Sequence, residues 1–247
     1  MSKLIKSIIK KFLPRILLKY YRLIYYFLIQ NKFKGMNNKE IFSMIYRKNM
    51  WGESKQKKKF DSGFGSRNNK IIDGFISNVN NFIINLNYKP TILDIGCGDF
   101  NVGKNIFLNS EKYIACDVVP DLIEYNKKIY KNPKIEFLTL DACEAKKLPK
   151  ANIVILRQVL QHLSNQKIKS ILEKIKYDYD YLIVCEHLPL ENYKPNIDIK
   201  TGDLSRLFIG SGVNIEKNPF NYKFTSKKII NEVVEKEGKL ITTIYKK

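Results

Sequence analysis

The stretch TILDIGCGD, residues 91–99, places a short apolar run directly before an acidic turn that is rich in glycine. The run TILDI predicts a buried strand, and the turn after it leads into the next helix. Glycine at positions 96 and 98 lets the backbone pass close to a ligand, because a side chain there would obstruct it. A dinucleotide-binding loop would have a third glycine where Asn101 stands, so the motif disfavours a pyrophosphate ligand.

Acidic residues follow three successive predicted strands. Asp94 lies inside the glycine motif and suits a ligand with an ammonium group better than one with phosphates. Asp117 lies 21 residues beyond Gly96, the spacing at which a carboxylate accepts the hydroxyls of an adenosine ribose. Asp141, with Ala142 after it, follows the third strand and can contact an adenine edge. Three such acids at successive strand ends are a more specific signal than the two glycines.

Alternating strand and helix patterns run outward from this motif. The predicted strands are 91–95, 113–116, 135–138, 153–156, 181–185 and 240–245, and the predicted helices are 102–108, 121–130, 168–175 and 227–236. Short Ile, Val and Leu runs between helices are typical of parallel strands covered on both faces. The sequence therefore predicts an α/β fold with a doubly wound, mostly parallel sheet, whose ligand lies at the carboxyl ends of the strands. No clear seventh strand is recognised.

The composition is that of a globular protein. The chain has 247 residues, of which 44% are hydrophobic and 12% aromatic, so disordered, collagen-like, mucin-like and disulfide-scaffold classes are excluded. Its length allows one large domain, or one domain with an appendage. The four cysteines form no C-x-x-C pair and no secretory signal is recognised, which favours buried thiols and a cytoplasmic location.

Positive charge is concentrated toward the amino terminus. Residues 1–60 contain 16 Lys and Arg against 2 acidic residues, while the remainder contains 28 against 22. This asymmetry points to an anionic partner, either lipid headgroups or nucleic acid. Several tyrosines of this region stand among Leu and Ile, which favours lipid.

Residues 1–36 are predicted to form a basic, amphipathic helical segment. Apolar residues and lysines occupy opposite halves of a helix over residues 3–13, and Pro14 can begin a second helix. Charges interrupt every apolar window up to Arg22, so neither a membrane span nor a cleavable signal is predicted. Two interpretations remain. Either residues 3–32 lie in the interface of the inner membrane face, or the second helix packs on the protein's own domain.

The motifs LDIGCG (93–98), ACD (115–117), LDA (140–142) and RQVLQHL (157–163) resemble those of class I S-adenosylmethionine-dependent methyltransferases. The resemblance extends from residue 89 to residue 186. It implies a Rossmann-like methyltransferase fold for residues 89–247, with S-adenosylmethionine as the cofactor. By this resemblance the methionine end would contact Asp94, Gly96, Cys97 and Gly98, the ribose Asp117 and Val118, the adenine Asp141 and Ala142, and the sulfonium side Arg157 and Gln158.

A weaker resemblance lies on both sides of this region. Met50-Trp51-Gly52, Ser62-Gly63-Phe64-Gly65-Ser66 and the stretch 195–206 are similar to a bacterial methyltransferase group associated with surface-polysaccharide genes. This similarity implies a sugar or glycan-type acceptor, contacted by Trp51, Ser62, Ser66, Asp198 and Arg206. Residues 37–88 would be a helical cap with a glycine-containing linker, and 188–224 a lid-like insertion. Without the resemblance, 62–66 fits a flexible linker equally well, and 188–224 a disordered insertion.

The methyl group of a sulfonium is already activated, so the protein must chiefly position the acceptor and supply a base. The two histidines are His162, shortly after the fourth predicted strand, and His187, just after the fifth. An ordinary imidazole pKa near ~6.5 suits base catalysis at neutral pH. By the methyltransferase resemblance, His162 stands where several O-methyltransferases keep a catalytic histidine, while Glu186 could orient His187. The alternative is that the histidines are structural.

The leading interpretation is O-methylation of a sugar or glycan-type acceptor by a protein held at the inner membrane face. RQVL at 157–160 differs from the motif of exocyclic-amine methylation, no Pro-Cys or Thr-Cys pair is present, and metal-ligand spacing is lacking, so no metal is expected. One alternative is an RNA methyltransferase whose basic terminus holds phosphates. Another is a non-catalytic cofactor-binding module. The acceptor, the methylated atom, the choice between the histidines and the oligomeric state stay open.

Overall fold

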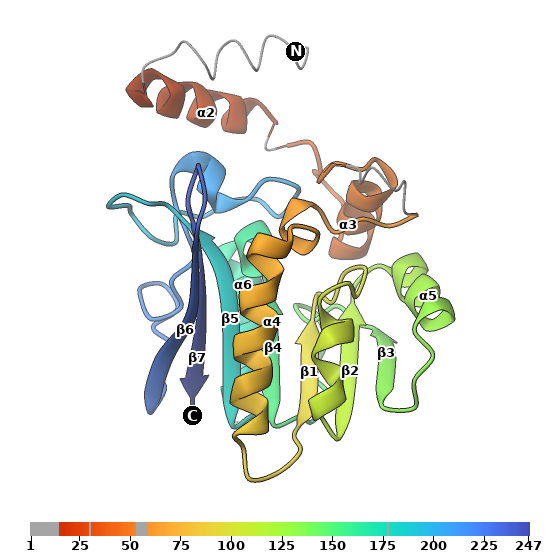
Figure 1. Ribbon diagram of the computed structural model, residues 1–247. Helices are drawn as coiled ribbons and strands as arrows, with labels where there is room; N and C mark the ends of the chain where they lie inside the picture. The colour runs from red at the N-terminus through yellow and green to blue at the C-terminus, as the bar shows by residue number, and fades with distance from the viewer. Residues whose placement is uncertain (1–14, 30, 53–58, 177) are drawn as a thin grey trace.

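The structure is a computed structural model that describes residues 15–29, 31–52, 59–176 and 178–247. Within these residues the centre is a sheet of seven strands in the order β3-β2-β1-β4-β5-β7-β6 (Figure 1). The strands are β1 (Thr91–Ile95), β2 (Lys112–Asp117), β3 (Ile135–Thr139), β4 (Ile153–Arg157), β5 (Tyr181–Leu188), β6 (Ser226–Val234) and β7 (Lys239–Lys246). The helix predicted over residues 3–13 lies outside the described residues.

The sheet is parallel from β3 to β5, and β7 runs antiparallel to both β5 and β6. Strands β2 and β3 are added in turn on one side of β1, and β4 and β5 are added in turn on its other side. The order therefore reverses between β1 and β4, and ligands of open α/β sheets bind beside such a reversal, at the carboxyl ends of the strands.

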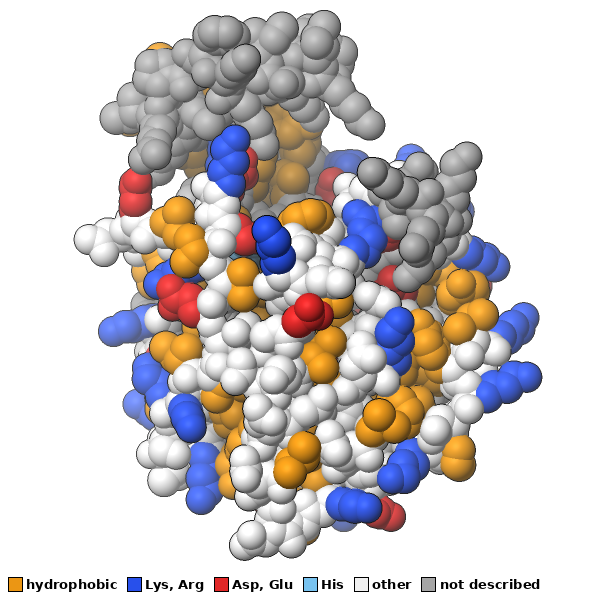
Figure 2. Space-filling view, viewed as in Figure 1, with side chains coloured by type: hydrophobic (Ala, Val, Ile, Leu, Met, Phe, Trp, Pro, Cys, Tyr) orange, Lys and Arg blue, Asp and Glu red, His pale blue; other side chains and the backbone are white. Residues whose placement is uncertain are grey.

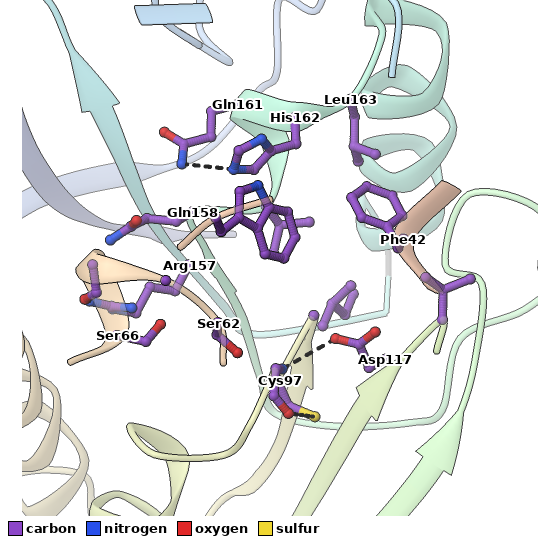
Figure 3. Close-up of a pocket in the computed structure, with 18 of the residues that line it drawn as sticks. Phe42, Ser62, Ser66, Cys97, Asp117, Arg157, Gln158, Gln161, His162 and Leu163 are labelled. Atoms are coloured by element: carbon purple, nitrogen blue, oxygen red, sulfur yellow. Dashed lines mark hydrogen bonds between the residues drawn. The ribbon is translucent and has the colours of Figure 1, made fainter. Parts of the chain in front are cut away.

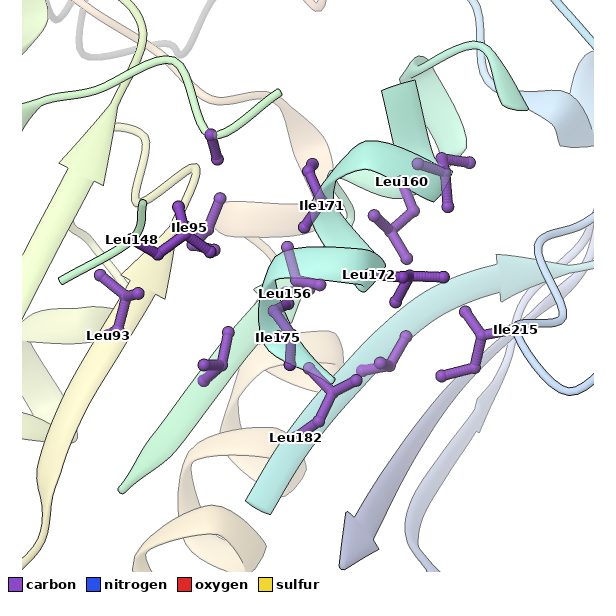
Figure 4. Packing of buried hydrophobic residues seen from close by; sticks show 14 of the residues in the cluster. Leu93, Ile95, Leu148, Leu156, Leu160, Ile171, Leu172, Ile175, Leu182 and Ile215 are labelled. Carbon is purple, nitrogen blue, oxygen red and sulfur yellow. The ribbon is translucent and has the colours of Figure 1, made fainter. Parts of the chain in front are cut away.

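Helices cover both faces of the sheet, because side chains of a strand alternate between its faces. Ile92 packs into the core under α4 (Asn69–Ile84), whereas its neighbour Leu93 packs into the core under α6 (Asn165–Ile175). Figure 4 shows the second core, in which Ile171 and Leu172 of α6 meet the strands. This arrangement confirms the predicted doubly wound α/β fold. The strand-linking helix α5 (Pro120–Ile129) begins at a proline, which suits the first helical turn.

Two further helices precede the sheet in the chain, α2 (Arg15–Ile29) and α3 (Asn38–Arg47). Both lie beyond the edge where the parallel strands end (Figure 1). Tyr26 of α2 is buried against Ile199 and Ile209, so one face of this helix packs on the protein's own domain. None of the helices in the described part of the chain has the length and apolarity of a membrane span.

Two predicted helices are wrong. Residues 102–108 lie across two short 3-10 turns, η2 (Gly103–Asn105) and η3 (Phe107–Asn109), and glycine at position 103 disfavours a longer α-helix. Residues 227–236 mostly belong to β6, which is the seventh strand that the sequence did not reveal. Its backbone pairs with β7 across a register shift between Ile229 and Asn231, and its exposed lysines are typical of an edge strand.

The stretch between β5 and β6 contains one short 3-10 helix, η5 (Arg206–Ile209), within an irregular but packed segment. The side chain of Asn196 donates to the carbonyls of Asn214 and Asn218 at 2.8 and 3.0 Å. Ile199, Ile209 and Ile215 are buried. Side-chain hydrogen bonds and apolar burial therefore hold this segment against the sheet.

Candidate functional site

A cavity of about 420 Å³ lies at the carboxyl ends of β1 and β4, beside the reversal of strand order. It is lined by the turns after the strands, by α3, by the 62–66 turn and by residues 203–208 (Figure 3). All ten residues predicted to bind the cofactor line this one cavity: Asp94, Gly96, Cys97, Gly98, Asp117, Val118, Asp141, Ala142, Arg157 and Gln158.

The glycine loop after β1 requires glycine for two reasons. Gly96 and Gly98 have φ of +75° and +58°, a region that residues with a side chain rarely adopt. A Cβ on Gly96 would lie 2.5 Å from a methyl of Val159, and one on Gly98 would lie 2.3 Å from Ser62 Oγ. The loop is thus pressed against two neighbouring turns as well as open to a ligand.

Two buried acids stand at the floor of the cavity. Asp94 accepts a hydrogen bond from the Tyr113 hydroxyl at 2.9 Å, and burial raises its pKa to about 7, although Tyr113 and the Arg157 charge oppose the rise. Asp117 accepts backbone N–H groups of Gly98 and Val119 at 3.2 and 3.1 Å, yet burial still raises its pKa to about 6. A cation bound beside either carboxyl would lower its pKa, because a nearby opposite charge favours the ionised form.

The third acid, Asp141, accepts hydrogen bonds from a side chain of α3. Asn38 Nδ2 lies 3.1 and 2.9 Å from the two carboxylate oxygens, and the Cys143 N–H donates at 2.9 Å. Phe42 and Tyr46 follow Asn38 at intervals of four residues and also line the cavity. Asn38, Phe42 and Tyr46 were not predicted from the sequence as site residues. Their signal was the capping box of Asn37 and Glu40, which begins an amphipathic helix.

The turn 62–66 packs against the residues after β4. Arg157 donates to the Gly65 carbonyl at 2.7 Å, and a Cβ on Gly65 would lie 2.3 Å from the Gln158 amide oxygen. Ser62 Oγ accepts the Asp99 N–H at 2.8 Å, and Ser66 O accepts from the Asn101 amide at 2.7 Å. Ser62 and Ser66 both line the cavity, so this turn forms part of its wall.

His162 ends η4 (Leu160–His162), the short turn after β4, and lines the same cavity. Its ring lies 5.2 Å from the Trp51 ring, centroid to centroid, and its Nε2 lies 3.2 Å from Gln161 Nε2. Burial lowers the His162 pKa to about 4, so the imidazole is neutral at physiological pH. Trp51 also lines the cavity, and its indole N–H donates to the Asp203 carbonyl at 3.2 Å.

The structure does not bring His187 into the cavity. Its Nε2 lies 3.2 Å from a carboxylate oxygen of Glu235 instead. Glu186 faces the other way, because neighbouring strand residues point to opposite faces. Its carboxylate accepts the N–H groups of residues 159–161 at 2.8 to 3.2 Å, and burial raises its pKa to about 8. Glu186 therefore supports η4 and does not orient His187.

Asp198 and Arg206 also lie outside the cavity, contrary to the sequence analysis. Arg206 is completely buried and donates to the carbonyls of Ile197 and Leu160 and to Asn165 Oδ1, at 2.7 to 3.1 Å. Asp198 is largely exposed and accepts the Asn165 N–H at 2.7 Å. The segment does supply a wall of the cavity, but through five other residues: Asp203, Leu204, Ser205, Leu207 and Phe208.

No group of three or more His, Cys, Asp and Glu side chains with the geometry of a metal site is found among the described residues.

Residues 92–177 match the family model described as a methyltransferase domain. The chain is an enzyme of the class I methyltransferase type. Its methyl donor is S-adenosylmethionine.

Solved methyltransferases share the fold of this methyltransferase. Human N-acetylserotonin methyltransferase in complex with S-adenosylmethionine is 15% identical, with a TM-score of 0.55 over 93% of this chain and 66% of that one. The N-methyltransferase NodS from Bradyrhizobium japonicum, in complex with S-adenosylhomocysteine, is 10% identical, with a TM-score of 0.53 over 74% and 90%. A Leishmania major S-adenosylmethionine-dependent methyltransferase is 14% identical, with a TM-score of 0.51 over 71% and 72%. A search of curated protein sequences finds no match.

Proposed function

We propose that this methyltransferase methylates a hydroxyl of a sugar or glycan-type acceptor, with His162 as the general base. The support is that a neutral histidine lines the same cavity as the three strand-end acids. A neutral imidazole has a lone pair that can accept the hydroxyl proton as the oxygen is methylated. Its pKa of about 4 makes it a weaker base than the ordinary imidazole expected from the sequence. His187 is not part of the proposal, because it lies outside this cavity.

We infer which residues of the cavity would contact each part of the donor. Bound S-adenosylmethionine supplies an activated methyl group on a sulfonium. Asp94, with the loop Gly96-Cys97-Gly98, would face the methionine end, and Asp117 with Val118 would accept from the ribose. Asp141 with Ala142 would face the adenine. This assignment is supported by the positions of the three acids, which line one cavity at or just after the ends of β1, β2 and β3.

The acceptor would lie on the side of the cavity between Arg157, Gln158 and Trp51. Trp51 offers an aromatic surface beside His162, and the hydroxyls of Ser62 and Ser66 lie along the same cavity wall. A sugar has both apolar C–H faces and hydroxyl groups, which suits a wall of this mixed character. We also propose that the acceptor lies at the inner membrane face, where the exposed apolar side chains of α2 would contact lipid.

The experiment is methyl transfer from labelled S-adenosylmethionine to a glycan extract, with host RNA as a parallel acceptor. His162→Gln and His162→Ala should lower turnover at least a hundredfold while S-adenosylhomocysteine binds normally by titration calorimetry. His187→Gln is the matched control and should keep its turnover. Labelled RNA without labelled glycan would favour the RNA alternative. Unchanged turnover of both His162 variants would show that this histidine is not the base.

A further inference from the structure

The face of α2 opposite Tyr26 carries an apolar stripe that the described residues leave exposed. At 100° per residue, five large side chains of this helix fall on one side of it. Their exposed fractions range from 50% to 77%, although all are apolar or aromatic: Leu17, Tyr20, Ile24, Phe27 and Leu28. Tyr26 lies on the opposite side of the helix and is buried. A contiguous stripe of this kind marks a contact surface more strongly than scattered exposed residues do.

The buried face of α2 packs on the wall of the cavity. The Tyr25 and Phe208 rings lie 6.0 Å apart, and the Arg22 guanidinium lies 5.7 Å from the centre of the same Phe208 ring. Arg22 also pairs with Glu237 at 3.3 Å, and both Phe208 and Glu237 line the cavity. One helix thickness, about 10 Å, therefore separates the exposed stripe from the cavity wall.

Charge decides which partner suits this stripe. The chain has a formal net charge of +20, and its first 60 residues contain 16 Lys and Arg against 2 acidic residues. Figure 2 shows Lys and Arg side chains spread over the face of the molecule drawn there, with fewer acidic ones. A second copy of so basic a chain would be repelled, whereas an anionic lipid surface attracts a chain of this net charge.

We propose that the stripe of α2 docks on an anionic membrane surface and thereby holds the cavity wall at headgroup level. The acceptor is then a hydroxyl of a lipid-linked glycan presented at that surface. This substrate class rests on the proposed function, whereas the docking does not depend on it. Phe208 and Glu237 connect the two, since each contacts α2 and lines the cavity.

The test is co-sedimentation of the full chain with vesicles of phosphatidylcholine containing one third phosphatidylglycerol. We expect binding to these vesicles, at least tenfold weaker binding to phosphatidylcholine alone, and a loss of binding at high salt. The triple variant Ile24→Ser, Phe27→Ser, Leu28→Ser should bind at least tenfold more weakly than the wild type. A control triple variant, Ile84→Ser, Leu108→Ser, Ile129→Ser, removes similarly exposed side chains from other elements and should bind like the wild type.

Equal binding of the two triple variants, or no binding of the wild type, would overturn the docking. So would a dimer in the absence of lipid that the α2 triple variant abolishes, because the stripe would then join two copies. S-adenosylhomocysteine binding, measured on every variant without vesicles, reports on the methyltransferase function separately. Vesicle binding without donor binding would refute the proposed function alone, and donor binding without vesicle binding would refute the docking alone.

Discussion

Asn38, in the first turn of α3, donates its side-chain amide to both oxygens of Asp141, at 3.1 and 2.9 Å, across 103 residues of chain. The side-chain oxygen of Asn38, Oδ1, accepts a hydrogen bond from the ammonium of Lys167 in α6. Asn38 is 3% exposed, whereas Asp141 and Lys167 are half-buried, so the centre of this chain of three polar side chains is shielded from water. It ties the helix that covers the cavity to the acid expected to face the adenine.

Replacing Asn38 by Ala should weaken S-adenosylhomocysteine binding about tenfold. The carboxylate of Asp141 would lose the group that orients it, and Lys167 would lose its acceptor. The free energy of unfolding should fall by about 1–3 kcal/mol for the same reason. Titration calorimetry and thermal unfolding measure the two effects. Lys39→Ala, on the exposed side of the same helix, is the control, and a folded Asn38→Ala variant with normal affinity would contradict the assigned role.

Gly98→Ala should be far more damaging than Gly210→Ala. Both glycines have positive φ, +58° and +71°, so both changes add backbone strain of roughly 1–2 kcal/mol. At Gly210 nothing lies within 4 Å of the new Cβ, whereas at Gly98 it would meet Ser62 Oγ at 2.3 Å. Gly98→Ala should therefore lose donor binding as well as stability. Equal unfolding temperatures and equal affinities of the two variants would show that the contact with Ser62 does not matter.

Donor binding should depend on pH through Asp94. Its pKa of about 7 leaves it mostly protonated at pH 6 and mostly ionised at pH 8, and the ammonium of the ligand favours the ionised form. We expect S-adenosylhomocysteine to bind about tenfold more weakly at pH 6 than at pH 8, as calorimetry at each pH would show. Asp94→Asn should bind weakly at both values, with a flattened pH dependence. A wild-type affinity that is constant over this range would contradict the expectation.

The same shift has a consequence for stability. The folded protein holds the Asp94 proton more tightly than the unfolded chain does, because the pKa is about 7 in one and 3.8 in the other. The contribution of this group to the free energy of unfolding is therefore full at acid pH and is lost as the pH rises from about 4 to about 7. Asp94→Asn should remove that decline, and urea unfolding across this range would measure the difference between the two proteins.

Arg206→Met should reduce stability rather than the affinity for the donor. The guanidinium is wholly buried, and its removal leaves the carbonyls of Ile197 and Leu160 without that donor. We expect a loss of about 3 kcal/mol or more in urea unfolding, with normal donor binding in the folded protein. Asp198→Asn is exposed and should change stability by less than about 0.5 kcal/mol. A stable Arg206→Met protein that loses turnover would restore the acceptor contact predicted for this residue from the sequence.

Strands β1, β2, β4 and β5 could be predicted because they are buried along most of their length and read as apolar runs. The edge strand β3 has the pattern IEFLT, in which Ile135, Phe137 and Leu138 were enough to reveal it. β6 could not be predicted, because an edge strand needs little apolar surface. Its sequence SKKIINEVV also fits an amphipathic helix. Only pairing with β7, through backbone groups that leave no trace in the side chains, decides between the two.

The candidate site likewise has residues whose positions could be predicted from the sequence and others whose positions could not. Asp94, Asp117 and Asp141 each follow a recognisable strand, and parallel strands bring their carboxyl ends to one edge, so their meeting could be predicted. The position of His187 could not, since a shift of one residue along a strand moves a side chain to the other face. Glu186 supports η4, and His187 pairs with Glu235.

The sequence by itself determined the fold class and the half of the cavity that fits the donor, because both follow from strand order and from short motifs within about ten residues. Only the tertiary structure decided which other segments close the cavity. Asn38 and Phe42 of α3 and Phe208 of η5 reach it from segments far apart in the chain. Their positions depend on how irregular segments and helices pack, and such long-range contacts have no periodic pattern in the sequence.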